Sequence, residues 1–138
     1  MASLTVEILT PEAPLWSGAA SALVARSREG DFTVLAGHTA LVGNVVPGVV
    51  RVATPEGEVA FCVHGGVFQV ATVEGDTRAT VLAGVAERTT EIDVARAAAA
   101  KERAEAALAA DAEDPAARLW AQAELERAER RLGAAQGG

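Results

Sequence analysis

The chain has 138 residues, of which 50% are hydrophobic and 22% are charged, and its formal net charge is −7 at pH 7. This balance is typical of a folded protein with one sizeable core and argues against disorder. Nucleic-acid binding needs clustered Lys and Arg side chains that displace counterions, and this acidic chain has no basic face. We therefore expect no nucleic acid among its partners.

The first residues, MASLTVEILTP, lack the basic stretch and the long apolar run of a secretory signal. No apolar run reaches the roughly 18 residues of a membrane span, so we expect an intracellular protein without direct membrane insertion. Cys62 is the only cysteine, which excludes an internal disulfide and a multi-cysteine metal site. Its position inside VAFCV favours a small strand side chain over a reactive thiol.

Residues 1–86 consist of short runs rich in Val, Leu, Thr and Phe, which Gly or Pro interrupts every several residues. These runs predict strands near 3–9, 20–26, 32–35, 41–45, 48–54, 58–64, 67–73 and 78–84. In the first and sixth of them, apolar side chains alternate along the strand and share one face. TPEG (54–57) and EGD (74–76) predict hairpin turns. Short strands with tight turns and no intervening helices predict an antiparallel β-sandwich or flattened barrel.

The period of the apolar residues changes at Thr90 from that of a strand to that of a helix. Thr90, with Asp93 three residues later, predicts a helix start, and this helix should run to about Ala110. Asp114 followed by Pro115 then predicts the N-cap and first turn of a second helix. This second helix should end near residue 132, before a glycine, and the short connection predicts an antiparallel hairpin.

The expected packing surface of the hairpin consists mostly of alanine. One face of each helix carries small apolar residues, namely Val94, Ala97, Ala98, Ala104 and Leu108 on the first and Ala121, Leu125, Ala128 and Leu132 on the second. Burial stabilises by about 0.8 kcal/mol per CH₂ group, so an interface of methyl groups is marginal and can separate cheaply. The sequence thus predicts an α+β fold with two domains, a sandwich over 1–86 and a helical hairpin over 87–138.

No motif of a known enzyme class stands out. The chain has no P-loop and no GxGxxG, and the glycine pair at 65–66 predicts a turn between strands. His38 and His64 have no partner at a customary metal-ligand spacing, and no serine or cysteine lies in a nucleophile elbow. We therefore expect neither catalysis nor a metal, although a small hydrolase of unfamiliar design stays an alternative.

Five segments nevertheless occur in a distinctive order: GDFTVLAGHTALV (30–42), PGVVRV (47–52), HGGVFQV (64–70), TVLAGVAE (80–87) and EIDVARA (91–97). Together they resemble the epsilon subunit of the bacterial F-type ATP synthase over essentially the whole chain. The resemblance implies an N-terminal sandwich of about ten strands and a C-terminal pair of helices, in agreement with the period of the sequence. It implies a non-catalytic subunit of the central stalk, or rotor, of a proton-translocating enzyme that makes ATP.

The resemblance also implies partners. The sandwich is expected to bind the gamma subunit and the ring of c subunits, which would hold the protein peripherally at the cytoplasmic face of the bacterial cell membrane. Residues of the loop near this contact are Glu29, Asp31, His38, Thr39, Leu41 and Val42. The alternative for these residues is ordinary loop polarity.

The hairpin is the part for which the resemblance implies regulation. It is expected either to fold against the sandwich or to extend into the alpha/beta catalytic head, where it inhibits ATP hydrolysis. Arginines that would then meet an acidic segment of the head are Arg118, Arg127, Arg130 and Arg131. The alternative is a solvated helix face with ion pairs such as that of Glu126 with Arg130.

Some members of this family bind ATP without hydrolysing it, and the resemblance extends to their motif. The matching residues are Glu87, Ile92, Asp93, Arg96, Ala97 and Arg103. Asp93 would accept from the adenine amino group, while Arg96 and Arg103 would face phosphate oxygens. The alternative is an ion pair between Asp93 and Arg96 within the helix. ATP would thus be a regulatory ligand and no cofactor is required; a free-standing ATP-sensing module is the alternative function.

Overall fold

The computed structural model describes residues 3–110 and 113–136. It divides the chain into two compact units, Met1–Arg88 and Thr89–Gly138. The first unit thus ends at Arg88, whereas the sequence predicted the boundary two residues earlier, after Ala86. The first unit contains the strands and the second contains the helices.

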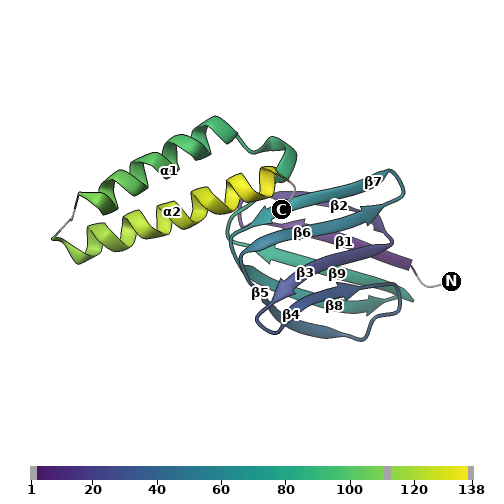
Figure 1. Ribbon diagram of the computed structural model, residues 1–138. Coiled ribbons are helices and arrows are strands. Elements are labelled where there is room, and N and C mark those ends of the chain that lie inside the picture. The colour runs from purple at the N-terminus through teal and green to yellow at the C-terminus, as the bar shows by residue number, and fades with distance from the viewer. Residues whose placement is uncertain (1–2, 111–112, 137–138) are drawn as a thin grey trace. The chain divides into compact units, whose positions relative to one another are not determined.

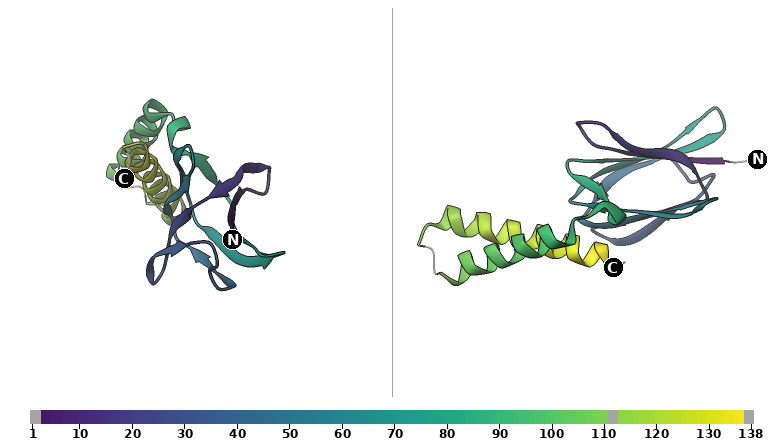
Figure 2. Two further views of the ribbon diagram at one scale, coloured as in Figure 1. Left: turned by 90° about the vertical axis from the view of Figure 1, so that its right-hand side faces the viewer. Right: turned by 90° about the horizontal axis from the view of Figure 1, so that it is seen from above.

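The first unit is a β-sandwich of two five-stranded sheets, in the orders β2-β1-β9-β8-β5 and β10-β7-β6-β3-β4 (Figures 1 and 2). The strands are β1 (Ser3–Leu9), β2 (Pro14–Ala20), β3 (Ala22–Ser27), β4 (Gly30–Val34), β5 (Leu41–Val45), β6 (Gly48–Thr54), β7 (Gly57–Val63), β8 (Gly66–Val73), β9 (Asp76–Ala83) and β10 (Ala86–Arg88). This architecture confirms the predicted sandwich. Strands β1 and β9 pair in parallel, however, so one sheet is mixed and not purely antiparallel.

The core between the two sheets follows the period of two in the sequence. Leu4, Val6 and Ile8 of β1 are buried, and so are Phe61 and Val63 of β7, as the alternation predicts. The buried cluster comprises Leu4, Val6, Ile8, Leu23, Ala25, Val34, Val45, Val50, Val52, Phe61, Val63, Phe68, Val70, Ala79, Val81 and Ala83. All of it belongs to the first unit, which therefore has a core of its own.

Strands β2 and β10 do not follow from the pattern of the sequence. The β2 segment, PLWSGAA, holds no β-branched residue, and its strand conformation comes from pairing with β1, where Trp16 lies opposite Ile8. Trp16 packs against the core with its ring centroid 6.4 Å from that of Phe61. Strand β10 has only three residues, too few for an alternation to be recognised.

The predicted turn at Gly65 and Gly66 connects β7 of one sheet to β8 of the other. Gly65 has a φ of +98°, a conformation that glycine adopts without a steric penalty. A Cβ atom on Gly66 would lie 2.3 Å from the backbone oxygen of Leu82 in the neighbouring strand. Both glycines are therefore required by the backbone.

The second unit contains a short 3₁₀ turn, η1 (Thr89–Glu91), and two antiparallel helices, α1 (Val94–Ala109) and α2 (Pro115–Ala135) (Figure 1). The prediction that Thr90 begins the first helix is wrong, because Asp93 is the N-cap. Asp114 is the N-cap of α2, as predicted. The predicted stop at Gly133 is also wrong: the alanines that follow are strong helix formers and outweigh the cost of one glycine, about 1 kcal/mol.

Alanines form the buried part of the hairpin. Ala97 and Ala104 are buried on α1, and Ala121 and Ala128 are buried on α2, in each case seven residues apart and so on one helix face. The inclusion of Val94 and Ala98 in this surface is wrong, since both are exposed. In the part of the chain that the structure describes, neither helix is apolar enough for a membrane span.

Candidate functional site

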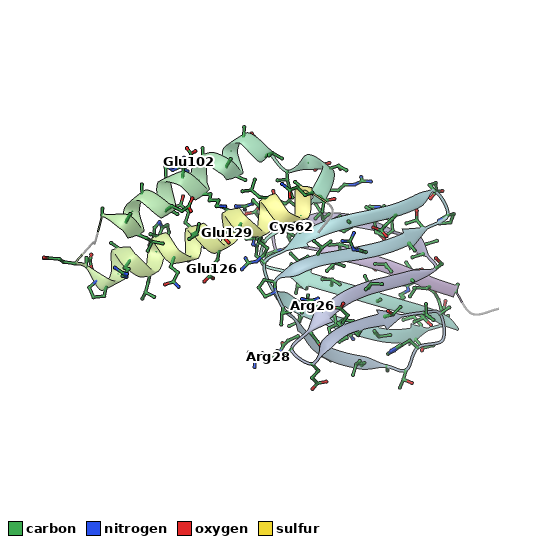
Figure 3. All side chains as sticks on the ribbon, in the orientation of Figure 1. Arg26, Arg28, Cys62, Glu102, Glu126 and Glu129 are labelled. Atoms are coloured by element: carbon green, nitrogen blue, oxygen red, sulfur yellow. The ribbon has the colours of Figure 1, made fainter. Side chains whose placement is uncertain are left out.

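A groove of about 410 Å³ lies where the sandwich is open, between the edge strands β4 and β5. Its lining residues are Ser27, Arg28, Glu29, Phe32, Leu41, Val42, Gly43, Asn44 and Phe68. The floor is aromatic, because the rings of Phe32 and Phe68 stack with centroids 4.3 Å apart. Arg28, which lines the groove, lies at the turn between β3 and β4 (Figure 3). The groove thus combines an apolar floor with charged residues at one end.

Three of the predicted interface residues, Glu29, Leu41 and Val42, meet at this groove. Leu41 exposes 45% of its surface and Val42 exposes 72%. Gly43, the next residue of β5, leaves room for the Phe68 ring, since a Cβ atom there would lie 2.6 Å from Cε1 of that ring. The sequence did not predict the groove, because its two walls belong to different sheets.

The other predicted interface residues form contacts with residues close to them in the sequence. Asp31 accepts a hydrogen bond from Nε of Arg26 at 2.7 Å, and this bond together with the Arg26 charge holds the pKa of Asp31 below its usual range. The ring atom Nδ1 of His38 lies 2.7 Å from the carbonyl oxygen of Thr39. Neither Asp31, His38 nor Thr39 lines the groove. Asp31 thus joins β4 to β3, and His38 contacts the backbone of the loop between β4 and β5.

The four predicted arginines of the hairpin do not lie on one face of α2. Arg127, Arg130 and Arg131 are related by steps of three and four residues, which places them together. Arg118 lies about two and a half turns before Arg127 and therefore points to the opposite side. Arg118 is exposed, while the other three are half-buried.

The hairpin surface also carries acidic residues. Glu102 on α1 and Glu126 and Glu129 on α2 are exposed (Figure 3). Glu124 of α2 receives a contact from Arg103 of α1, with 3.5 Å between Nη2 and Oε1. The hairpin surface is therefore of mixed charge.

The predicted nucleotide motif lies at the start of α1. Ile92 and Ala97 are buried and anchor this turn. Oδ1 of Asp93 accepts from the backbone N–H of Arg96 at 3.0 Å. Among the described residues, no ion pair joins the two side chains, so the alternative of an intrahelical Asp93–Arg96 pair is not what the structure contains. The Asp93 carboxylate caps the helix through one of its oxygens.

Arg96 and Arg103 share one face of α1, about two turns and about 10.5 Å apart along the axis. The Arg96 side chain is exposed, while that of Arg103 lies beside Glu124. Glu87, the remaining residue of the motif, belongs to the first unit, on β10. Five of the six predicted residues therefore lie along α1 and at its N-terminal cap, while Glu87 lies on a strand of the first unit.

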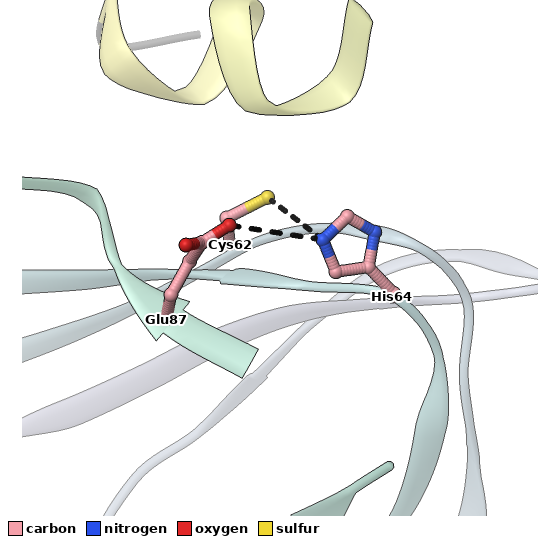
Figure 4. Close-up of side chains that lie close together, drawn as sticks. All are labelled: Cys62, His64 and Glu87. Atoms are coloured by element: carbon pink, nitrogen blue, oxygen red, sulfur yellow. Dashed lines mark hydrogen bonds and ion pairs between the residues drawn. The ribbon is translucent and has the colours of Figure 1, made fainter. Parts of the chain in front are cut away.

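Glu87 belongs to a group of three side chains with metal-ligating atoms, together with Cys62 and His64 (Figure 4). Glu87 pairs with Cys62 in the register of β10 and β7, and His64 follows Cys62 by two residues. Nε2 of His64 lies 3.9 Å from Sγ of Cys62 and 4.0 Å from Oε1 of Glu87. No motif in the sequence predicted this group. A spacing of two residues on a strand was the available signal, because it places both side chains on one face.

Known proteins that resemble this chain in sequence are chains of ATP synthases. A family model described as "ATP synthase, Delta/Epsilon chain, beta-sandwich domain" matches residues 3–89. The ATP synthase epsilon chain of Thermobifida fusca is 40% identical over 113 residues, which are 80% of each chain. The ATP synthase epsilon chain of Bordetella avium is 38% identical over 120 residues, 85% of this chain and 82% of the other.

A solved structure extends the likeness to both units. A chain in the cryo-EM structure of Euglena gracilis mitochondrial ATP synthase, with OSCP, F1 and the c-ring in rotational state 1, superposes with a TM-score of 0.78. The match covers 97% of this chain and 82% of that chain at 26% identity. The likeness therefore includes the helices, which lie beyond the residues that the family model matches.

Proposed function

This chain belongs to the ATP synthase Delta/Epsilon chain family, and on that premise we propose that it is the non-catalytic epsilon subunit of a proton-translocating F-type ATP synthase. The observation that carries this proposal is the match of the family model to the sandwich, residues 3–89. The similarity to a chain of an assembly with F1 and the c-ring supports a place in the central stalk. The protein would then be peripheral, at the cytoplasmic face of the bacterial cell membrane.

The groove between β4 and β5 is the surface that we assign to the gamma subunit and the c-ring. Leu41 and Val42 are large exposed apolar side chains beside an aromatic floor, and such surfaces on soluble units mark protein contacts. A charge at Val42 should abolish co-purification with gamma and the c-ring while the chain stays folded. Val73→Asp, on an exposed apolar residue of β8, is the control for Val42→Asp. Equal binding by both variants would exclude the groove.

The hairpin is the element that we assign to inhibition of ATP hydrolysis. The interface between its two helices consists mostly of alanine and buries little apolar surface, so separating the helices costs little. In an assembled complex, a chain that ends at Arg88 should give faster ATP hydrolysis than the full chain. Replacing Arg127, Arg130 and Arg131 by Gln should give the same increase, and Arg118→Gln, on the opposite face, should not. Unchanged hydrolysis with the shortened chain would show that the hairpin does not inhibit.

ATP is the regulatory ligand that we assign to the start of α1. Arg96 and Arg103 offer two guanidinium groups on one helix face for phosphate oxygens. The helix cap uses Oδ1 of Asp93 and not its second carboxylate oxygen. At a hundred times its dissociation constant, ATP would stabilise the bound position by about 2.7 kcal/mol, enough to hold a marginal hairpin. Calorimetry should show binding by the isolated chain and about tenfold weaker binding by Arg96→Ala. The absence of a heat of binding at millimolar ATP would contradict this assignment.

A further inference from the structure

One face of the sheet β10-β7-β6-β3-β4 carries a sulfur, a nitrogen and an oxygen ligand side by side (Figure 4). Phe61 and Val63 of β7 belong to the core, so Cys62 projects from the opposite face of the sheet. His64 directly follows the strand and lies beside Cys62. Glu87 is the register partner of Cys62 across the antiparallel pair of β10 and β7, and its side chain shares that face. The pairing of β10 with β7 therefore fixes Glu87 beside Cys62, and His64, the residue after β7, lies close to both.

The geometry excludes a catalytic relay of the Cys-His-acid type. Such a relay uses both ring nitrogens of the histidine, one toward the thiol and the other toward the acid. Here Sγ of Cys62 and Oε1 of Glu87 both approach the same atom, Nε2 of His64, at 3.9 and 4.0 Å. The three ligand atoms lie within 4.8 Å of one another. They converge on one point, which is the arrangement of a chelate.

We propose that Cys62, His64 and Glu87 bind one Zn²⁺ ion, with water at a fourth position. Typical zinc distances to sulfur, nitrogen and oxygen place the ligand atoms of a tetrahedral site about 3.3–3.6 Å apart. Small side-chain rotations close the difference from the observed separations. Thiolate and imidazole favour zinc over magnesium or calcium. Zinc binding requires the neutral imidazole ring of His64 and the thiolate form of Cys62, so the thiol proton is released to solvent.

Glu87 is the most exposed of the three ligands. Cys62 is fully buried, while the side chains of His64 and Glu87 expose 6% and 31% of their surfaces. A partly exposed carboxylate can capture the ion first and pass it to the two inner ligands. Glu87 also belongs to the nucleotide motif, so zinc binding should be measured without ATP. The site does not depend on the proposed role in the ATP synthase.

Cobalt(II) titration of the reduced, chelator-treated full chain tests this site directly. Cys62 is the only thiol, so a thiolate-to-cobalt charge-transfer band reports on this residue alone. We expect saturation at one equivalent of Co²⁺ and complete displacement of the band by Zn²⁺. His64→Gln and Glu87→Gln should each weaken binding at least tenfold, and Cys62→Ser should abolish the band. His38→Gln and Glu58→Gln are the matched controls and should bind as the unmodified chain does.

Three outcomes would overturn the proposal. These are no band at millimolar Co²⁺, unchanged affinity of His64→Gln, and saturation at half an equivalent, which would mean thiolates from two molecules. Thermal unfolding without metal establishes that each variant is folded. Because Cys62→Ser alters a fully buried position, X-ray absorption of the unmodified zinc complex gives a second measurement. It should show one sulfur and the remaining scatterers as nitrogen or oxygen, and a shell without sulfur would contradict the assignment.

Discussion

Oδ1 of Asp93 accepts a hydrogen bond from the backbone N–H of Arg96 at 3.0 Å, so the helix cap joins two of the four polar residues of the nucleotide motif. The same carboxylate that would contact adenine therefore also starts α1. A capping aspartate uses one oxygen for the backbone and keeps the other for a ligand. Mutations at this residue have to separate the two roles.

Two substitutions of Asp93 separate them. Asp93→Ala removes both the cap and the carboxylate, and should destabilise the hairpin by about 0.5–2 kcal/mol. Asp93→Ser keeps a capping oxygen and should retain most of that stability. If the carboxylate binds ATP, both variants lose ATP binding to the same extent. Calorimetry with ATP and circular dichroism of the helices give the two readouts.

Asp114, the N-cap of α2, supplies the control for these substitutions. It accepts from the backbone N–H of Ala116 at 3.0 Å and stands outside the motif. Asp114→Ala should lower helix stability by a similar amount and leave ATP binding unchanged. Should Asp93→Ser bind ATP normally, the aspartate of the motif is a cap and not a ligand.

The contact between Arg103 and Glu124 predicts a gain in ATP affinity. Arg103 has to leave Glu124 in order to face a phosphate, and an exposed ion pair of this kind is worth about 0–1 kcal/mol. Glu124→Gln should therefore strengthen ATP binding by up to about fivefold. Glu126→Gln removes the same charge from α2 without touching Arg103. An equal gain in both variants would mean that net charge, and not the pair, is responsible.

Most of the fold could be predicted because burial imposes a period on the sequence. Alternation identified the inner faces of β1 and β7, and Asp114 followed by Pro115 identified the start of α2. Alternation contains no information on the partner or direction of a strand, so the parallel pairing of β1 with β9 did not follow from it. Strand β2 was missed because its conformation depends on its neighbour.

The candidate sites were predicted only where their residues are close in the sequence. Asp93, Arg96 and Ala97 lie within one helical turn, so their proximity follows from the helix itself. Glu87 reaches Cys62 through strand pairing, and the groove forms between edge strands of two sheets. These contacts depend on topology, which a single sequence does not specify.

Asp76 should make the stability of the sandwich depend on pH. Hydrogen bonds from Ser3 and from Thr5, the latter at 2.8 Å, hold the pKa of Asp76 below its usual range, and Arg78 adds to this effect. Because the unfolded chain binds the proton more readily, the stabilisation is present above the ordinary aspartate pKa, about 3.9. It is lost as the pH falls through the lower pKa of the folded state.

The variant Asp76→Asn tests this dependence. It should lower the thermal midpoint at pH 7, and the difference from the unmodified chain should shrink as the pH falls below about 4. Glu56→Gln, at an exposed turn, is the control and should leave the midpoint unchanged at every pH. A difference that stays constant down to pH 2 would show that Asp76 acts through packing and not through its charge.

Gly66 should tolerate no side chain, although alanine is the smallest replacement. Its Cβ would lie 2.3 Å from the Leu82 backbone oxygen and 3.0 Å from Cα of Ala83, so β8 and β9 would have to move apart. We expect Gly66→Ala to lower the free energy of unfolding by about 2 kcal/mol or more, as backbone-level overpacking does. Gly48→Ala is the control, because a Cβ there meets no atom within 4 Å. Denaturant unfolding of both variants measures the difference, and equal midpoints would mean that the sheet absorbs the added atom without strain.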